Sequence, residues 1–136
     1  MAKSVRKKGC LTVFLAVSAI LVIMAVITFL SMGKKMETYK GFDFTKLDLS
    51  NIEDGTYTGS EDGKLVKVTV KVTVKDHKIT GIDIIEHQNG KGQPAEAITK
   101  DIIEKNSPDV DAISGATLSS NVIKVAVYNA LIGNMK

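Results

Sequence analysis

The sequence predicts an α+β domain, an antiparallel β-sheet with one or two helices packed on it, preceded by one N-terminal transmembrane helix. Three observations carry this prediction. Residues 9–33 contain no charged side chain, β-branched residues alternate with polar ones over residues 65–75, and apolar residues recur at helical spacing over residues 118–132. At 136 residues, the chain has room for one domain beside the apolar stretch.

The apolar stretch has the length of a membrane span. Residues 11–30 are almost wholly apolar, and twenty helical residues extend about 30 Å, the thickness of a bilayer core. A cleaved signal peptide usually has a shorter apolar run of about 7–15 residues, although residues 31–33 would form a small-residue cleavage site. The length favours a retained anchor. Cys10 precedes the run, as an ordinary interface residue or, as the weaker alternative, a reversibly acylated one.

The charges are segregated and set the expected orientation. Four basic residues precede the apolar stretch, and only three lysines, partly offset by Glu37, follow it closely. The more positively charged flank of a membrane-spanning helix stays in the cytoplasm. We therefore expect a cytoplasmic basic tail at residues 1–8, a single-pass anchor in the cell membrane at residues 9–33, and an extracytoplasmic C-terminal domain. From residue 34 onward, 14 lysines stand against 15 acidic residues. This balance argues against nucleic acid as a partner.

Residues 34–53 are expected to form a tether. Their apolar residues, such as Phe42 and Phe44, alternate loosely with charged ones. An arm that packs on the domain and a flexible spacer are equally compatible with this pattern. The domain itself is expected at residues 54–136.

The clearest strand pattern lies at residues 65–75. Five valines fall on one face and lysines and threonines on the other, which indicates a half-buried antiparallel strand. A turn at residues 76–77 leads into a second strand at residues 78–87, with a bulge near Gly81 where the apolar phase shifts. The turn at Asp62-Gly63 follows a first strand at residues 56–60. The second strand is expected to supply core contacts through Ile79, Ile82, Ile84 and Ile85.

Two helices follow the strands. Pro94 stands at the first position of a helix expected at residues 94–105, after a glycine-rich loop at residues 88–93. The last helix is expected at about residues 118–132, and Gly133 ends it. Its apolar positions are Val122, Ile123, Ala126, Val127, Ala130 and Leu131.

A cluster of hydroxyl groups precedes the last helix. Residues 111–120 contain one aspartate, one glycine and four hydroxyls, of Ser114, Thr117, Ser119 and Ser120. A serine or threonine at such a point is the usual N-cap of a helix. The free N–H groups of the first turn and the positive end of the helix dipole also favour a bound phosphate. The chemistry fits either an ordinary capped helix or hydroxyls presented at a phosphate site.

Other chemistries fit the sequence less well. Ser114 or Thr117 with His87 and Asp111 would suggest a hydrolase, but the sequence has no G-x-S-x-G nucleophile elbow. A metal site built from His77 and His87 lacks cysteine or a close carboxylate pattern. The chain also has no dinucleotide fingerprint or P-loop, so it is not built to bind NADH or ATP.

Residues 111–120 read DAISGATLSS, and this segment closely resembles the flavinylation motif of the FMN-binding domain family. That family includes the flavin-carrying subunits of the sodium-translocating NADH:quinone reductase and of Rnf complexes, and small extracytoplasmic flavoproteins. The resemblance extends to residues 54–60, DGTYTGS, and to His87 with the glycine-rich stretch after it. It covers roughly residues 53–133.

The resemblance implies that FMN is attached covalently, through a phosphoester to the hydroxyl of Thr117, by a flavin transferase that uses FAD. Leu118 stands where many small members have an aromatic residue, so no ring stacking is implied. The resemblance also implies that Ser114, Gly115 and Ala116 shape the attachment loop. Asp111 would position this loop or assist the transferase reaction. Ser119 and Ser120 would cap the helix or contact the phosphate. A place near the flavin is implied for His87, with structural capping of its loop as the equal alternative.

The function that follows is electron transfer rather than stand-alone catalysis. Electrons are expected from a membrane quinol or a membrane-bound dehydrogenase, and are expected to leave to an extracytoplasmic acceptor or a partner flavoprotein. The main alternative is a membrane-tethered interaction or sensory module of the same fold without covalent flavin. A second alternative, an enzyme that reduces a small substrate at the flavin, would share the attachment.

Overall fold

The computed structural model describes residues 2–88 and 93–135, with helix α1 side chains described at residues 12–31, 34 and 37–40. The chain divides into two units, Met1–Lys35 and Met36–Lys136. Most of the glycine-rich loop predicted at residues 88–93 lies outside the described residues. The side chains of the basic tail and of Cys10 lie outside them as well.

Helix α1, Ala2–Lys40, contains the predicted apolar span. Its segment Thr12–Ser31 has a mean hydropathy of 3.0 and is not buried inside the structure. The hydroxyl of Ser18 donates to a carbonyl of the preceding turn, as does that of Thr28. Such local bonds satisfy polar groups where no water is present. The segment is compatible with a membrane anchor or a signal sequence.

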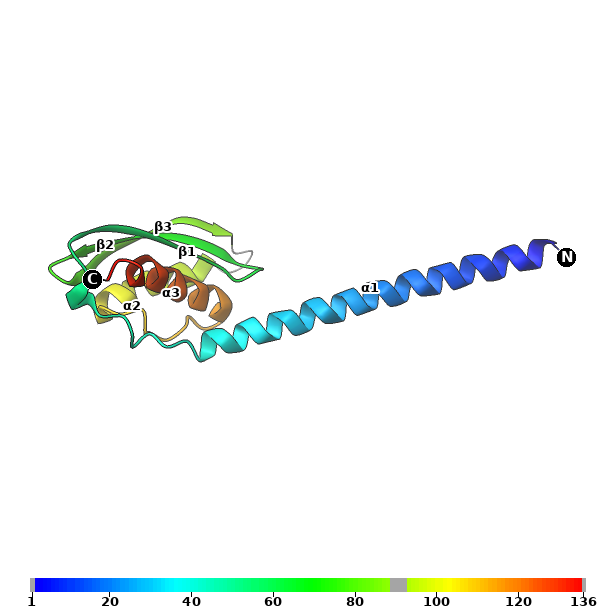
Figure 1. Ribbon diagram of the computed structural model, residues 1–136, viewed down its shortest axis with the longest axis horizontal. Helices are drawn as coiled ribbons and strands as arrows, with labels where there is room; N and C mark the ends of the chain where they lie inside the picture. The colour runs from blue at the N-terminus through cyan, green and yellow to red at the C-terminus, as the bar shows by residue number, and fades with distance from the viewer. Residues whose placement is uncertain (1, 89–92, 136) are drawn as a thin grey trace. The chain divides into compact units, whose positions relative to one another are not determined.

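The second unit is an α+β domain, which confirms the predicted fold class. Strands β1 (Gly55–Asp62), β2 (Lys67–Lys75) and β3 (Lys78–Gln88) form an antiparallel sheet in the order β1-β2-β3. The 3-10 helix η2 (Gln93–Ala97) and the helices α2 (Ile98–Lys105) and α3 (Thr117–Ile132) follow. Helix α3 packs on β1 and β2 and helix α2 on β3, so both cover the same face of the sheet (Figure 1).

The alternating pattern of β2 places its valines in the core. Val66, just before the strand, and the four valines within it are at most 5% exposed, and the lysines between them face solvent. Asp76 and His77 connect β2 to β3 with φ angles of 52° and 60°. Positive φ at both central residues is the geometry of a type I′ hairpin, whose twist matches that of the strands. The carboxylate of Asp54 accepts from the N–H of Asp76 and secures this turn.

Strand β3 contains two bulges, of which one was predicted. Thr73 of β2 is opposite Gly81 and Val74 is opposite Ile79, so β3 has one extra residue at the predicted position. A second extra residue, Ile85, lies between the partners of Thr69 and Val70. The expectation that Ile85 contacts the core is wrong, because its side chain is 56% exposed at this bulge.

Helix α3 is buried almost all round. Every residue from position 119 to position 128 is buried, although the sheet covers only one side of the helix. The other side is covered in part by residues 41–52, here called the arm, whose Phe42 and Phe44 rings lie against Tyr128. A helix that is apolar all round needs cover on every side. The arm supplies part of it.

The arm packs on the domain, which was one of the two alternatives for the tether predicted at residues 34–53, whereas residues 34–40 of that tether belong to helix α1. Phe44 is 8% exposed and Ile52 is 1% exposed. Between them, the 3-10 helix η1 (Leu49–Asn51) is capped by Asp48, whose carboxylate accepts from the N–H of Ser50. Tyr39, just before the arm, is also buried, and its hydroxyl donates to Glu61.

Candidate functional site

The segment between α2 and α3, residues 107–116, is here called the attachment loop because it leads to Thr117. Thr117 is the first residue of α3, and its side chain is exposed. The N-cap position is Ala116, which makes no side-chain capping bond. The predicted hydroxyl cap is therefore wrong, since Ser119 and Ser120 already lie inside the first turn of the helix.

Ser120 instead holds the end of the attachment loop. Its hydroxyl is fully buried, accepts from the N–H of Ile113 at 3.0 Å and donates to the carbonyl of Ala116 at 2.8 Å. The N–H of Ala116 also donates to the carbonyl of Ile113, which closes a β-turn. Ser119, 3% exposed, is buried in the same helical turn. Ser120 thus supports the loop from inside.

Gly115 is required by this turn. It is the third residue of the turn and has a φ of 80°, the conformation that a type II turn needs and glycine adopts without strain. The space where its side chain would be is open, with no atom within 4 Å. Ser114 is exposed beside it, and Leu118 is partly buried against the core. The turn therefore leaves Thr117 accessible.

An acidic groove lies beside the first half of the attachment loop. It has a volume of about 680 Å³. Four carboxylates and two ammonium groups line it, so its excess of negative charge disfavours a phosphate. The charged lining residues are Asp101, Glu104, Lys105, Asp109, Asp111 and Lys124. Asp111 is thus exposed at this groove.

Lys124 is a site residue that the sequence analysis missed. Its side chain is 9% exposed, and its Nζ donates to the carbonyl of Val110 at 2.5 Å. Burial lowers the pKa of the Lys124 ammonium, and the carboxylates of Asp109 and Asp111 oppose that shift. The available signal was a single lysine within the apolar pattern of α3, two helical turns after Thr117.

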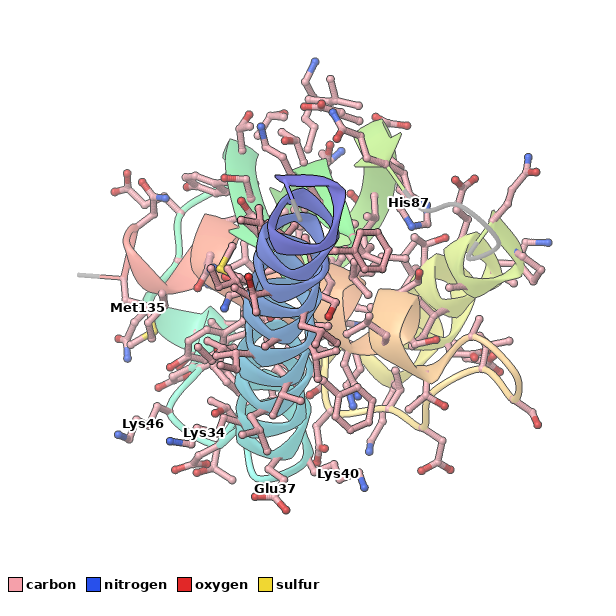
Figure 2. All side chains as sticks on the ribbon, turned by 90° about the vertical axis from the view of Figure 1, so that its right-hand side faces the viewer. Lys34, Glu37, Lys40, Lys46, His87 and Met135 are labelled. Carbon is pink, nitrogen blue, oxygen red and sulfur yellow. The ribbon has the colours of Figure 1, made fainter. Side chains whose placement is uncertain are left out.

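His87 is positioned by a contact with η2. Its Nδ1 lies 2.9 Å from Oε1 of Glu96, and its side chain is 3% exposed. Figure 2 shows His87 on β3, with its ring toward η2. Strand β3 ends and helix α3 begins at the same end of the domain (Figure 1). This contact fits the structural alternative for His87, and a place near a flavin stays a prediction.

The residues around Thr117 fit a phosphate ester. An exposed hydroxyl stands on the first residue of a 16-residue helix, and the N-cap residue of this helix, Ala116, makes no side-chain capping bond to its N–H groups. Such N–H groups and the helix dipole stabilise the charge of a phosphate. The open space at Gly115 leaves room beside the hydroxyl. The start of α3 is therefore chemically suited to a phosphate group, and Thr117 as the point of attachment stays a prediction.

Comparison with known proteins identifies the family. A family model described as FMN-binding domain matches residues 63–132, a little over half of the chain. The chain therefore belongs to the FMN-binding domain family, which confirms the family that the sequence analysis predicted. This membership supports FMN as the cofactor and a flavoprotein as the class of protein.

The chain is also similar to an uncharacterized protein of Treponema pallidum. The two are 28% identical over 89 residues, which is 63% of this chain. The chain spans about a quarter of the length of that relative, 25%.

Proposed function

We propose that this chain is a membrane-anchored, extracytoplasmic electron-transfer flavoprotein with FMN attached through a phosphoester to Thr117. The observation that carries the proposal is the exposed Thr117 hydroxyl on the first residue of α3, at the end of a loop that buried groups hold in place. The apolar segment Thr12–Ser31 supplies the anchor, and the basic residues before it favour a cytoplasmic N-terminus.

The attachment is a transfer from FAD, catalysed by a separate flavin transferase. A bond forms between Oγ of Thr117 and the phosphorus of the FMN half of FAD, and the phosphoanhydride bond of FAD breaks. AMP leaves, and the hydroxyl proton is released. The N–H groups at the start of α3 would stabilise the phosphate of the product. Gly115 keeps the approach to the hydroxyl open.

When bound, FMN supplies the redox chemistry, and the protein supplies its position and exposure. Electrons arrive from a membrane quinol or a membrane-bound dehydrogenase and leave to an extracytoplasmic acceptor or a partner flavoprotein. Covalent attachment keeps the cofactor on the protein outside the cytoplasm, where free FMN is not replenished.

The test is the mass and fluorescence of the full chain produced with and without a flavin transferase. We expect a fluorescent band that survives denaturation and a mass increase of one FMN less one water. Thr117→Ala should abolish both signals, and the control Thr80→Ala, at an exposed threonine of β3, should keep them. A wild-type chain that stays unmodified beside an active transferase would overturn the proposal and favour the tethered module without covalent flavin.

A further inference from the structure

The side chain of Lys124, on α3, contacts both the arm and the attachment loop. The Nζ of Lys124 lies 5.0 Å from the centroid of the Phe44 ring, and the same Nζ donates to the carbonyl of Val110. Phe44 belongs to the arm, and Val110 immediately precedes Asp111 in the attachment loop. The largely buried side chain of Lys124 thus contacts both segments, which lie more than fifty residues apart in the chain.

A hydrogen bond, two carboxylates and an aromatic ring stabilise the Lys124 ammonium. A buried charge is costly unless hydrogen bonds or opposite charges compensate it. Lys124 obtains this compensation from the Val110 carbonyl and from the nearby carboxylates of Asp109 and Asp111. The face of the Phe44 ring adds a cation–π contact. Each of these partners lies in the attachment loop or in the arm.

The Phe44 ring is itself held firmly. It lies 4.8 Å from the ring of Phe42 and 5.9 Å from that of Tyr128, measured between centroids. Tyr128 follows Lys124 by one turn of α3. Because Phe44 is also 8% exposed, its ring has little freedom to leave the ammonium. The arm, through the ring of Phe44, therefore packs against one side of the Lys124 side chain.

Successive turns of α3 hold the attachment loop at two points. Ser120 binds the loop at Ile113 and Ala116, and Lys124, one turn later, binds it at Val110. Thr117 precedes Ser120 on the same side of the helix, since residues three and four apart are neighbours on a helix. The loop is thereby fixed against the helix that presents the hydroxyl.

We propose that Lys124 is a positioning residue for flavin attachment and that Phe44 of the arm helps to hold Lys124 in place. Lys124, backed by Phe44, sets the place of Val110 and hence of Asp111 relative to Thr117, in the conformation that a flavin transferase recognises. The matched family range begins at residue 63, so the arm adds a component that lies outside it. This inference rests on the proposed attachment to Thr117.

The experiment compares full-length variants in detergent or nanodiscs. Lys124→Met removes the charge at similar length, Lys124→Arg keeps it, and Phe44→Leu removes the ring while leaving the ammonium. Lys100→Met is the matched control, because Lys100 is exposed on α2. Two quantities are measured. One is the rate of flavin incorporation from FAD by a flavin transferase, and the other is the amide hydrogen exchange of residues 109–116 in the flavin-free chain.

We expect Lys124→Met to slow incorporation about tenfold and to speed exchange of the loop amides about tenfold, a change of about 1.4 kcal/mol. Lys124→Arg should have an incorporation rate and a loop exchange rate close to those of the wild type. Phe44→Leu should slow incorporation and speed exchange by less than Lys124→Met does, and Lys100→Met should resemble the wild type. If Lys124→Met does not fold, Phe44→Leu and Lys124→Arg carry the test.

Three outcomes overturn the inference, and they are distinguishable. Incorporation into Lys124→Met at the wild-type rate excludes any need for this residue. Slow incorporation with unchanged loop exchange shows that Lys124 acts otherwise than by positioning the loop. A wild-type chain that takes up no flavin overturns the proposed function, and this inference with it.

Discussion

A side chain at Gly59 would overlap the backbone nitrogen of Ala130, so strand β1 and helix α3 are in direct backbone contact at this point. It would also overlap the carbonyl oxygen of Ala126. Both atoms belong to the backbone of α3 and cannot move aside as a flexible side chain would. Gly59 therefore sets the closest approach of the helix to the sheet, and through it the depth at which α3 is buried.

Gly59→Ala should destabilise the domain by about 3 kcal/mol, because overpacking against backbone forces the helix and the sheet apart. The measurement is chemical denaturation of the full chain, followed by circular dichroism. Gly133→Ala is the control, since a side chain there would meet no atom within 4 Å. Its change in stability should stay within about 0.5 kcal/mol. Equal effects of the two changes would contradict the close-approach argument.

Ser120→Ala should reduce the free energy of unfolding by about 1–2 kcal/mol, because the N–H of Ile113 loses its buried acceptor. The same change should speed hydrogen exchange at the turn of residues 113–116. Ser119→Ala is a matched change in the same buried turn of α3 and should leave that exchange unchanged. A Ser120→Ala chain with wild-type exchange at Ile113 would show that the hydroxyl does not hold the loop.

The contact between His87 and Glu96 allows a double-mutant cycle. We expect His87→Ala and Glu96→Ala to be coupled by about 1 kcal/mol in unfolding free energy, since the two side chains meet at 2.9 Å. Flavin incorporation separates the two roles considered for His87. A purely structural role predicts equal effects of both changes on incorporation. A role toward the flavin predicts a loss in His87→Ala that Glu96→Ala does not share.

Asp48 makes the stability of the arm depend on pH. Hydrogen bonds from the side chain and the backbone N–H of Ser50 lower the pKa of the Asp48 carboxyl below its ordinary value of 3.8. A lowered folded-state pKa means that the unfolded chain takes up the proton first as the pH falls. The stabilisation is thus present above pH 3.8 and is lost as the pH falls through the folded-state pKa.

The stability difference between the wild type and Asp48→Ala should therefore be largest near pH 7 and shrink below pH 3.8. Denaturation midpoints of both proteins at several pH values provide the measurement. A difference that stays constant down to the lowest pH would mean that the ionised carboxylate is not what stabilises the arm.

The sheet and the last helix were predictable because their burial is periodic. The valines of β2 alternate strictly with polar residues, and the six apolar residues expected in α3 are fully buried. The bulge at Gly81 was visible as a shift of this period. The bulge at Ile85 was not visible, because two adjacent isoleucines hide the change of phase.

The arm and the supports of the attachment loop depend on contacts between distant residues, which leave no period in the sequence. Phe44 is buried against Tyr128 and Lys124 of α3, and the ammonium of Lys124 donates to the carbonyl of Val110. Helix α3 has more apolar residues than one face of a sheet can bury, and this excess was the indication in the sequence that another segment covers the helix. Local capping rules also could not choose among four neighbouring hydroxyls, and the helix begins with Ala116 at the cap position.

The support of the attachment loop by Ser120 has a consequence for biogenesis. The hydrogen bonds that Ser120 makes to Ile113 and Ala116 are made in the folded domain, where Ser120 is fully buried. A newly made chain that is still unfolded presents Thr117 without that geometry. If the transferase recognises the shaped turn, folding comes before modification. The covalent flavin would then mark the copies that have matured, and misfolded copies would stay colourless.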